Sequence, residues 1–291
     1  MLSSLRRLAV LAVAGPMAIG LAALPPSDAS AAVRLSTSPG LATPARGYLP
    51  PANPPANIAP IPDYTFKQGA LYSDNDLPVC WLTFSRSRPN NPSCLAAEVA
   101  ATDRAHRIEG LPAIGLPRNF VHLSAPEQLL VIVDIERVSR GEPPVVGISA
   151  RADQFAQRAA VANEDPSLPA EGSGIPGATG GYDSNWAGAI SPLDANYEWM
   201  YVDGWGGKAT FNYDCTSPHA AGCWGHRDNV LTDPARMPCY STCSLVMGAG
   251  FVRNGYSKQF GSYTELFVQV AGGLPPLSYT WSQALAAGAR P

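Results

Sequence analysis

The stretch Ser124-Ala-Pro-Glu-Gln-Leu-Leu-Val-Ile-Val-Asp-Ile-Glu-Arg-Val-Ser-Arg140 carries the strongest structural signal in this 291-residue sequence. Ser124 is a preferred N-cap residue, and Glu127 follows three positions later, as in a capping box. Residues 129–133 are apolar on every side of a helix, which is typical of a helix buried between two layers. Gly141 and Pro143-Pro144 then end it. We therefore predict a buried helix over 124–140, which argues against an all-β fold.

Two further helices are predicted downstream. One begins at Ser149 and has one face of mostly small residues, which permits close packing: Ala152, Phe155, Ala156, Ala159 and Ala160. The other begins at Ser191-Pro192, which supplies an N-cap and a proline at the first helical position, and it ends at Gly204. A shorter helix is predicted over 96–108.

Short apolar or alternating runs follow these helices. Residues 245–252 and 262–270 have this pattern, with glycine between them, and both are predicted to be strands. Helices that precede strands, instead of alternating regularly with them, favour an α+β layered domain.

The N-terminus has the pattern of a secretion signal. Arg6-Arg7 precedes an apolar run over 8–24, and Ala29-Ser30-Ala31 offers a small-x-small cleavage site. No later segment reaches the roughly 20 apolar residues of a membrane-spanning helix. We therefore expect cleavage after Ala31, no membrane span in the mature chain, and a place outside the cell or in the cell wall.

The rest of the chain divides by composition. Residues 32–62 are rich in proline and are expected to form a disordered, extended linker. Residues 63–118 are predicted to form an irregular lobe containing a disulfide, residues 119–275 the folded domain, and residues 276–291 a C-terminal tail. The net charge of −3 gives no support for nucleic-acid binding, which needs a concentrated basic surface.

Six cysteines follow the predicted cleavage site, and an even number in an exported chain favours disulfides. Their proximity in the sequence suggests the pairs Cys80–Cys94, Cys215–Cys223 and Cys239–Cys243. The segment Cys215-x3-His219-x3-Cys223-x2-His226 also offers the two sulfur and two nitrogen ligands of a zinc site. Its spacing is unlike that of a usual zinc finger, so the disulfide is favoured.

Three segments together resemble a divergent domain of the CAP superfamily (cysteine-rich secretory, antigen 5, pathogenesis-related), in a form similar to exported actinobacterial members. The first is residues 133–137 followed by Gly141-Glu-Pro-Pro-Val145. The second is Ser184-Asn-Trp-Ala-Gly188, in the place of the family's Gly-Glu-Asn-x-Ala. The third, Gly225-His-Arg-Asp-Asn-Val-Leu231, is the most specific. The resemblance covers about 119–270 and implies an α-β-α sandwich.

The resemblance also implies a central cleft, which in many CAP domains holds a metal between two His and two acidic residues. Here only His226 carries over. Ser184 replaces one acid, and Glu198 and Asp203 flank the position expected for the other. The resemblance therefore implies a degenerate cleft with no cofactor, in which His226 is the one weak candidate for binding a divalent metal.

Other interpretations of these residues stay open. His226, held by Glu198 or Asp203, can be a cleft ligand or acid–base group, or it can be a structural histidine that bonds the backbone. A Ser184–His226 triad with Asp183 or Asp228 has no nucleophile-elbow motif to support it. The segment around Asn185-Trp186 also resembles the opening strand of glutamic peptidases, which are all-β enzymes active in acid.

The sequence thus predicts a secreted CAP-like module that binds a lipid, a cell-wall glycan or a protein. Its candidate cleft residues are Ser184, Asn185, Trp186, Glu198, Asp203 and His226. The alternative is a secreted hydrolase, either metal-dependent through His226 or similar to the glutamic peptidases. Aromatic residues near the cleft can line a binding face or fill the core: Trp186, Tyr197, Trp199, Tyr201, Trp205 and Trp224.

Overall fold

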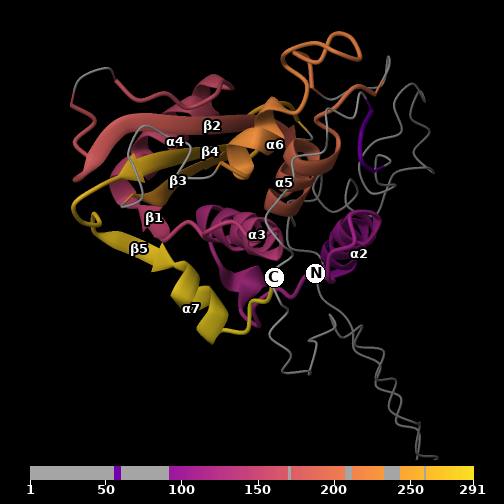
Figure 1. Cartoon of the computed structure of the whole chain (residues 1–291), viewed down its shortest axis with the longest axis horizontal. Coiled ribbons are helices and arrows are strands. Elements are labelled where there is room, and N and C mark those ends of the chain that lie inside the picture. Colours follow the sequence, from indigo (N-terminus) through magenta and orange to yellow (C-terminus); the bar gives the residue numbers. More distant parts are fainter. Residues whose placement is uncertain (1–55, 60–91, 170–171, 207–211, 233–242, 259) are drawn as a thin grey trace, which may run out of the picture. The chain divides into compact units, whose positions relative to one another are not determined.

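The computed structural model describes residues 56–59, 92–169, 172–206, 212–232, 243–258 and 260–291, all within the unit Val33–Pro291 (Figure 1). The predicted signal peptide, most of the proline-rich linker and the first part of the predicted lobe lie outside these residues. Within the described part of the chain, no helix is long and apolar enough to cross a membrane.

The helices follow the sequence predictions closely. They are α2 (Pro92–Ile108), α3 (Ala125–Ser139), α4 (Ala150–Ala162), α5 (Pro192–Tyr201), α6 (Gly225–Val230) and α7 (Trp281–Ala286), with a 3-10 turn at Phe120–His122. The four longest, α2 to α5, correspond to the four predicted helices. Helix α2 begins at Pro92 instead of residue 96.

Local capping explains why α3 and α5 start where they do. At α3 the Glu127 carboxylate accepts a hydrogen bond from the Ser124 backbone N–H at 2.7 Å, and the Ser124 hydroxyl accepts one from the Glu127 backbone. At α5 the Ser191 hydroxyl accepts from the Asp194 backbone N–H at 3.0 Å. Each cap satisfies amide groups that would otherwise lack a partner at the start of the helix.

Five strands form one mixed sheet, in the order β2-β4-β3-β1-β5. Their bounds are β1 (Gly147–Ser149), β2 (Ala178–Ala189), β3 (Ser244–Val252), β4 (Gly261–Val270) and β5 (Leu277–Thr280). Strands β1 and β3 are parallel, and the other pairs are antiparallel. Strands β3 and β4 match the two predicted strands, and the α+β class is confirmed.

The sheet lies between two layers of helices (Figure 1). Alternate residues of β3 and β4 point to opposite faces, as the pleat requires. Val246 and Leu266 pack with α4 on one face, while Met247 and Phe267 join the larger core on the other face, which includes α3 and α5. Gly248 lets the α4 backbone approach, since a Cβ there would lie 2.2 Å from a backbone atom of that helix.

Two parts of the sheet differ from the sequence predictions. Residues 276–291, predicted as a tail, contain β5 and α7, and β5 pairs with β1 at one edge of the sheet. Strand β2 was not predicted, because its glycine-rich first half lacks a clear alternating pattern. It is held by pairing with β4, about 80 residues away, as in Asn185↔Glu265. Such long-range pairing leaves little local signal.

A buried polar network joins three of the helices. The Glu136 carboxylate of α3 accepts hydrogen bonds from His106 Nε2 (2.9 Å), Arg140 Nη1 (2.5 Å) and the Tyr201 hydroxyl (2.6 Å). Burial alone would raise the pKa of Glu136, but the charges of His106 and Arg140 and the hydrogen bonds from His106 and Tyr201 lower it. The network therefore fixes α5, and with it the site at its C-terminal end, against α2 and α3.

Candidate functional site

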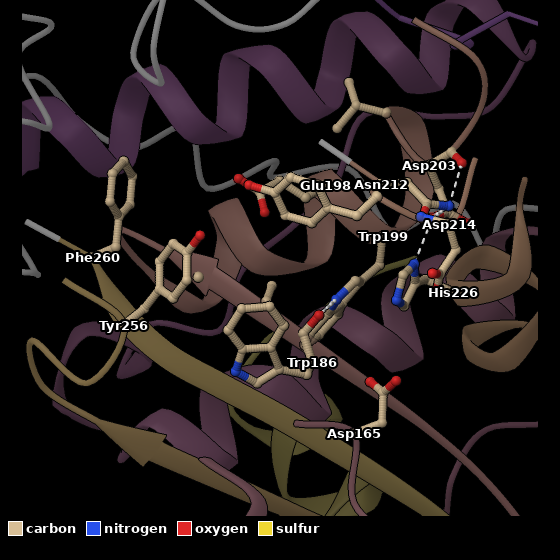
Figure 2. Close-up of a pocket in the computed structure, with 14 residues that line it drawn as sticks. Asp165, Trp186, Glu198, Trp199, Asp203, Asn212, Asp214, His226, Tyr256 and Phe260 are labelled. Carbon is tan, nitrogen blue, oxygen red and sulfur yellow. Dashed lines mark hydrogen bonds and ion pairs between the residues drawn. The ribbon is translucent and has the colours of Figure 1, made fainter. Parts of the chain in front are cut away.

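A cavity of about 390 Å³ lies where the C-terminal end of α5 meets edge strand β2 (Figure 2). Its polar side chains are mostly carboxyls: Asp165, Glu198, Asp203 and Asp214, with Asn212 and His226. Its aromatic side chains are Trp186, Trp199, Tyr213, Tyr256 and Phe260. The volume falls within the range of about 300–1,000 Å³ that is usual for small-molecule sites.

His226 and Asp203 form a tight pair in this cavity. The Nδ1 of His226 lies 2.6 Å from Asp203 Oδ1, so Asp203 is the carboxyl that holds the ring. Asp203 also accepts from the Arg227 backbone N–H at 3.2 Å and from Asn212 Nδ2 at 2.8 Å. With Nδ1–H donated to the carboxylate, the neutral ring has Nε2 as a free acceptor.

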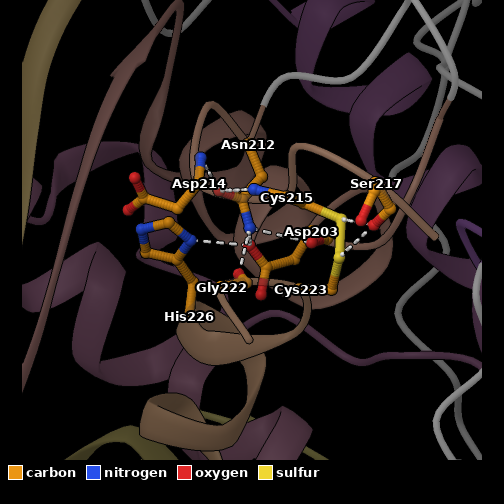
Figure 3. Close-up of a disulfide and its surroundings, with 8 residues drawn as sticks. All are labelled: Asp203, Asn212, Asp214, Cys215, Ser217, Gly222, Cys223 and His226. Atoms are coloured by element: carbon orange, nitrogen blue, oxygen red, sulfur yellow. Dashed lines mark hydrogen bonds and ion pairs between the residues drawn. A yellow bond between two sulfur atoms is a disulfide. The ribbon is translucent and has the colours of Figure 1, made fainter. Parts of the chain in front are cut away.

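The charge on His226 is set by its surroundings. Burial lowers its pKa, but the hydrogen bond and charge of Asp203, together with the charges of Asp165 and Asp214, raise it more. The net result is a pKa above the ordinary value. Figure 3 shows the Asp214 carboxylate beside the His226 ring, on the side away from the disulfide.

A disulfide-bonded loop carries Asp214 and Tyr213 to the cavity. Cys215 and Cys223 form the predicted disulfide, with a sequence separation of 8. Asn212 organises the loop, since its Oδ1 accepts from the Asp214 backbone N–H at 2.9 Å and its Nδ2 donates to the Asp203 carbonyl at 2.9 Å (Figure 3). The bonded sulfurs leave no thiolates for the zinc site considered from the sequence.

The other cysteines agree with an oxidised chain. Cys94 and Cys243 are also disulfide-bonded, and no described cysteine is free. Cys80 and Cys239, their predicted partners, lie outside the described residues.

Glu198 brings a half-buried carboxyl to the cavity from the last turn of α5. Burial, and then the charge of Asp194 one turn earlier, raise its pKa well above the usual range. Burial also raises the pKa of Asp194 to about 7. In the part of the chain that the structure describes, no side chain donates a hydrogen bond to the Glu198 carboxylate. The carbonyl oxygen of this carboxyl can therefore accept a hydrogen bond from a ligand.

The aromatic residues come from separate elements. Trp186 of β2 packs edge to face against Tyr256 of the β3–β4 turn, with ring centroids 5.2 Å apart, and Phe260 lies 6.5 Å beyond Tyr256. The Tyr213 hydroxyl is hydrogen-bonded to Tyr256, which links the disulfide loop to this turn. Gly188 is needed here, because a Cβ would lie 2.2 Å from the Tyr256 ring.

The outer edge of β2 helps to build the cavity. An edge strand leaves backbone groups without a neighbouring strand. At Trp186 the carbonyl accepts from Trp199 Nε1 at 3.1 Å, and the backbone N–H is bonded to the Asp165 carboxylate. The edge is therefore closed by cavity residues from the segment after α4 and from α5.

The structure separates the six cleft residues expected from the sequence. Trp186, Glu198, Asp203 and His226 line the cavity, while Ser184 and Asn185 do not. Asn185 is buried beneath it, where its Nδ2 donates to Glu265 Oε1 (2.7 Å) and to the His226 carbonyl (3.0 Å). Asn185 thus supports the backbone of His226.

The Ser184–His226 triad has no geometric support. His226 is bonded to Asp203, whereas Asp183 accepts from the Thr232 hydroxyl at 2.6 Å and Asp228 is exposed. Of the six aromatic residues considered, Trp186 and Trp199 line the cavity, Tyr197, Tyr201 and Trp224 are buried in the core, and Trp205 is half-buried outside the cavity.

Several cavity residues were not anticipated from the sequence. They are Asp165, Asn212, Tyr213, Asp214, Tyr256 and Phe260. All six lie outside the regular elements, in the segment after α4, the disulfide loop or the β3–β4 turn. The only local signal in the sequence was proximity to Cys215, and it applied to residues 212–214 alone.

Within the described residues, no three His, Cys, Asp or Glu side chains gather in a way that can hold a metal ion.

Comparison with known proteins found no matching family model, curated protein or solved structure.

Proposed function

We propose that the chain is a secreted, CAP-like binding module that holds a ligand in the cavity around His226. The observation that carries this proposal is the aromatic and acidic cavity itself, open to solvent and rigidly framed by α5, β2 and a disulfide. A preformed concave site with aromatic walls and a few convergent polar groups is the usual form of a binding site.

Two features support the link to the CAP superfamily. The α+β class and the helical layers on both faces of the sheet agree with the expected sandwich. His226, which belongs to the most specific of the three motif-like segments, lines the aromatic-walled cavity together with Glu198 and Asp203.

Export is supported by the signal-like N-terminus and by the Cys215–Cys223 disulfide, since such bonds persist in oxidising compartments. Sequencing the N-terminus of protein recovered from the culture medium tests this part. We expect the mature chain to begin at Ala32, and retention of the chain inside the cell would contradict export.

Hydrolysis is the second candidate function, and the His226–Asp203 pair is the observation that favours it. A histidine held by a carboxylate at 2.6 Å can activate a water molecule. Binding is preferred, because the described residues that line the cavity include no Ser, Thr, Cys or Lys nucleophile for covalent hydrolysis and no group of three metal ligands to hold an attacking water. The α+β fold disagrees with the all-β architecture that the glutamic-peptidase resemblance implies.

Isothermal titration of the secreted chain with three probes tests the binding function: chitotetraose, dodecanoate and hexylamine. We expect at least one probe to bind with one-to-one stoichiometry and to lose at least tenfold in affinity when Trp186 is replaced by Ala. Tyr182→Ala is the matched control, because Tyr182 is an exposed aromatic residue on the same strand, outside the cavity.

The enzyme alternative is tested with the same protein. Casein is incubated near pH 3 and at neutral pH, with and without chelator. Cleavage that His226→Ala abolishes would overturn the binding proposal, as would the failure of all three probes to bind. Saturable binding without cleavage would support it.

A further inference from the structure

The charges around the cavity are strongly one-sided. Four carboxyl groups line it, while none of its described lining residues is Lys or Arg. Among the lining residues that the structure describes, the other titratable side chains are His226, Tyr213 and Tyr256. Figure 2 shows Asp165 and Glu198 on opposite sides of Trp186, with His226 and Asp214 to one side. Asp203 is paired with His226, and the raised pKa of Glu198 favours its uncharged form, so a ligand there meets the negative charge of Asp165 and Asp214.

The hydrogen-bond donors of the cavity are largely occupied by the protein itself. Trp186 Nε1 donates to the Ser262 hydroxyl at 2.9 Å, and Trp199 Nε1 donates to a backbone carbonyl at 3.1 Å. Asn212 Nδ2 donates to Asp203 and to the Gly222 carbonyl at 2.7 Å. Ring nitrogen and amide donors therefore face inward to the fold.

The acceptors, in contrast, are available. The Glu198 carboxyl receives no side-chain donor from the described residues, so its carbonyl oxygen can accept a hydrogen bond, and the Asp214 carboxylate lies beside the His226 ring at the cavity. A neutral sugar both donates and accepts at each hydroxyl, so it needs donors from its site as well. This cavity instead complements a ligand that is rich in donors and positively charged.

The aromatic walls complement the same kind of ligand. Trp186, Tyr256 and Phe260 follow one another along one side, with ring centroids 5.2 and 6.5 Å apart. The faces of aromatic rings attract cations, and the attraction is largest for Trp and where water is excluded. Ring faces and carboxylates therefore act on one ligand charge together.

We propose that the cavity binds the ammonium group of an organic cation, such as an alkylamine or an amino-substituted sugar. This inference rests on the proposed function and names its ligand class. The ammonium group donates N–H hydrogen bonds to the carboxyl oxygens of Glu198 and Asp214. The attached carbon chain lies against Trp186 and Tyr256. The cavity of about 390 Å³ has room for a substituent larger than the ammonium group itself.

The test uses three probes that share a six-carbon chain: hexylamine, hexyltrimethylammonium and 1-hexanol. Each is titrated into the secreted chain by calorimetry at pH 7.5 in 50 mM salt. We expect hexylamine to bind at least tenfold more tightly than 1-hexanol, because the two differ mainly in charge. Hexyltrimethylammonium separates the role of charge from that of hydrogen bonding, since it keeps the charge and lacks N–H donors. Its affinity is expected to lie between those of hexylamine and 1-hexanol.

Charge-removing variants locate the interaction. Asp214→Asn keeps the shape of the side chain and is expected to weaken hexylamine binding at least fivefold, without changing the affinity for 1-hexanol. Glu164→Gln is the matched control, because Glu164 is an exposed carboxyl beside Asp165 that does not line the cavity. It should leave all three affinities unchanged.

The outcomes separate this inference from the proposed function. Equal affinity for hexylamine and 1-hexanol, or tight binding of chitotetraose alone, would overturn the cation proposal. The proposed binding function would still stand if Trp186→Ala weakened the binding of whichever probe binds. If no probe binds, both proposals fail. Hexylamine binding that is equally weakened by Glu164→Gln would show attraction to the general negative charge and would also overturn the inference.

Discussion

Glu265 lies in the centre of β4, fully buried below the candidate site. Its Oε1 accepts from Asn185 at 2.7 Å, while its Oε2 is buried without a hydrogen-bond partner. Burial raises the pKa of Glu265 to about 8, against the hydrogen bond from Asn185 and the charges of His226 and Arg137, which lower it. Glu265 is therefore protonated in the folded protein at neutral pH, and we predict that Glu265→Gln stabilises the protein.

The magnitude follows from linkage between protonation and folding. In the unfolded chain the carboxyl has its ordinary pKa of 4.5 and ionises as the pH rises, whereas in the folded chain it stays protonated up to about pH 8. The stability that protonation contributes is complete below pH 4.5 and is lost as the pH rises through 8. At about 1.36 kcal/mol per pH unit, the loss is about 3 kcal/mol at pH 7.

Glutamine resembles the protonated acid and cannot ionise, so the variant should not suffer this loss. We expect the free energy of unfolding of the variant to exceed that of the natural chain by about 3 kcal/mol at pH 7, after subtraction of the difference at pH 4. Urea unfolding from pH 4 to pH 9, with disulfides intact, measures it. The other buried carboxyls are present in both proteins and cancel in the comparison.

A difference that stays constant from pH 4 to pH 9 would refute this reasoning, because it would show that Glu265 does not titrate between the two states as described. Glu164→Gln controls for the general loss of a carboxyl. Glu164 is exposed, so its replacement should change the free energy of unfolding by no more than about 0.5 kcal/mol at pH 7.

Three further predictions concern stability, each measured by urea unfolding at pH 7. Gly248→Ala should lower the free energy of unfolding by about 3 kcal/mol, because its Cβ would clash with the α4 backbone. Gly225→Ala is the control and should be nearly neutral, because no atom lies within 4 Å of the added Cβ. Equal effects of the two substitutions would contradict the close packing of β3 on α4. Replacing Cys215 and Cys223 by Ser opens a loop with a sequence separation of 8, which should cost about 2.5 kcal/mol and weaken binding at the cavity; unchanged binding would show that the loop does not shape the site. Glu136→Gln should cost about 3–5 kcal/mol, since it removes the charge that faces buried cations, and a neutral effect would mean that the network is not ionised.

Much of the fold was predictable because its signals are local. The capping box of α3, the small-residue face of α4 and the Ser-Pro start of α5 each act within one or two turns of a helix, and each helix appears where it was predicted. The alternation of β3 and β4 likewise reflects the two faces of a sheet within each strand. The α+β class follows from these elements.

The site was predictable only in part. Trp186 and His226 were identified through two motif-like segments, and Glu198 and Asp203 through the helix between them. Ser184 and Asn185 were grouped with them by position in the sequence, but neither lines the cavity, and Asn185 points into the core toward Glu265. The pleat sends Asn185 and Trp186 to opposite faces of β2, so adjacency in a strand does not place these two side chains in one site.

The sequence alone determined the four longest helices, the two alternating strands and the Cys215–Cys223 disulfide, because each depends on residues close together in the chain. Only the tertiary structure decided that glycine-rich β2 is a strand, that residues 277–280 complete the sheet, and that Asp165, Asp214 and Tyr256 share a cavity with His226. These features depend on contacts between distant residues, whose cost in chain entropy is offset only when the whole core forms. No local pattern therefore records them.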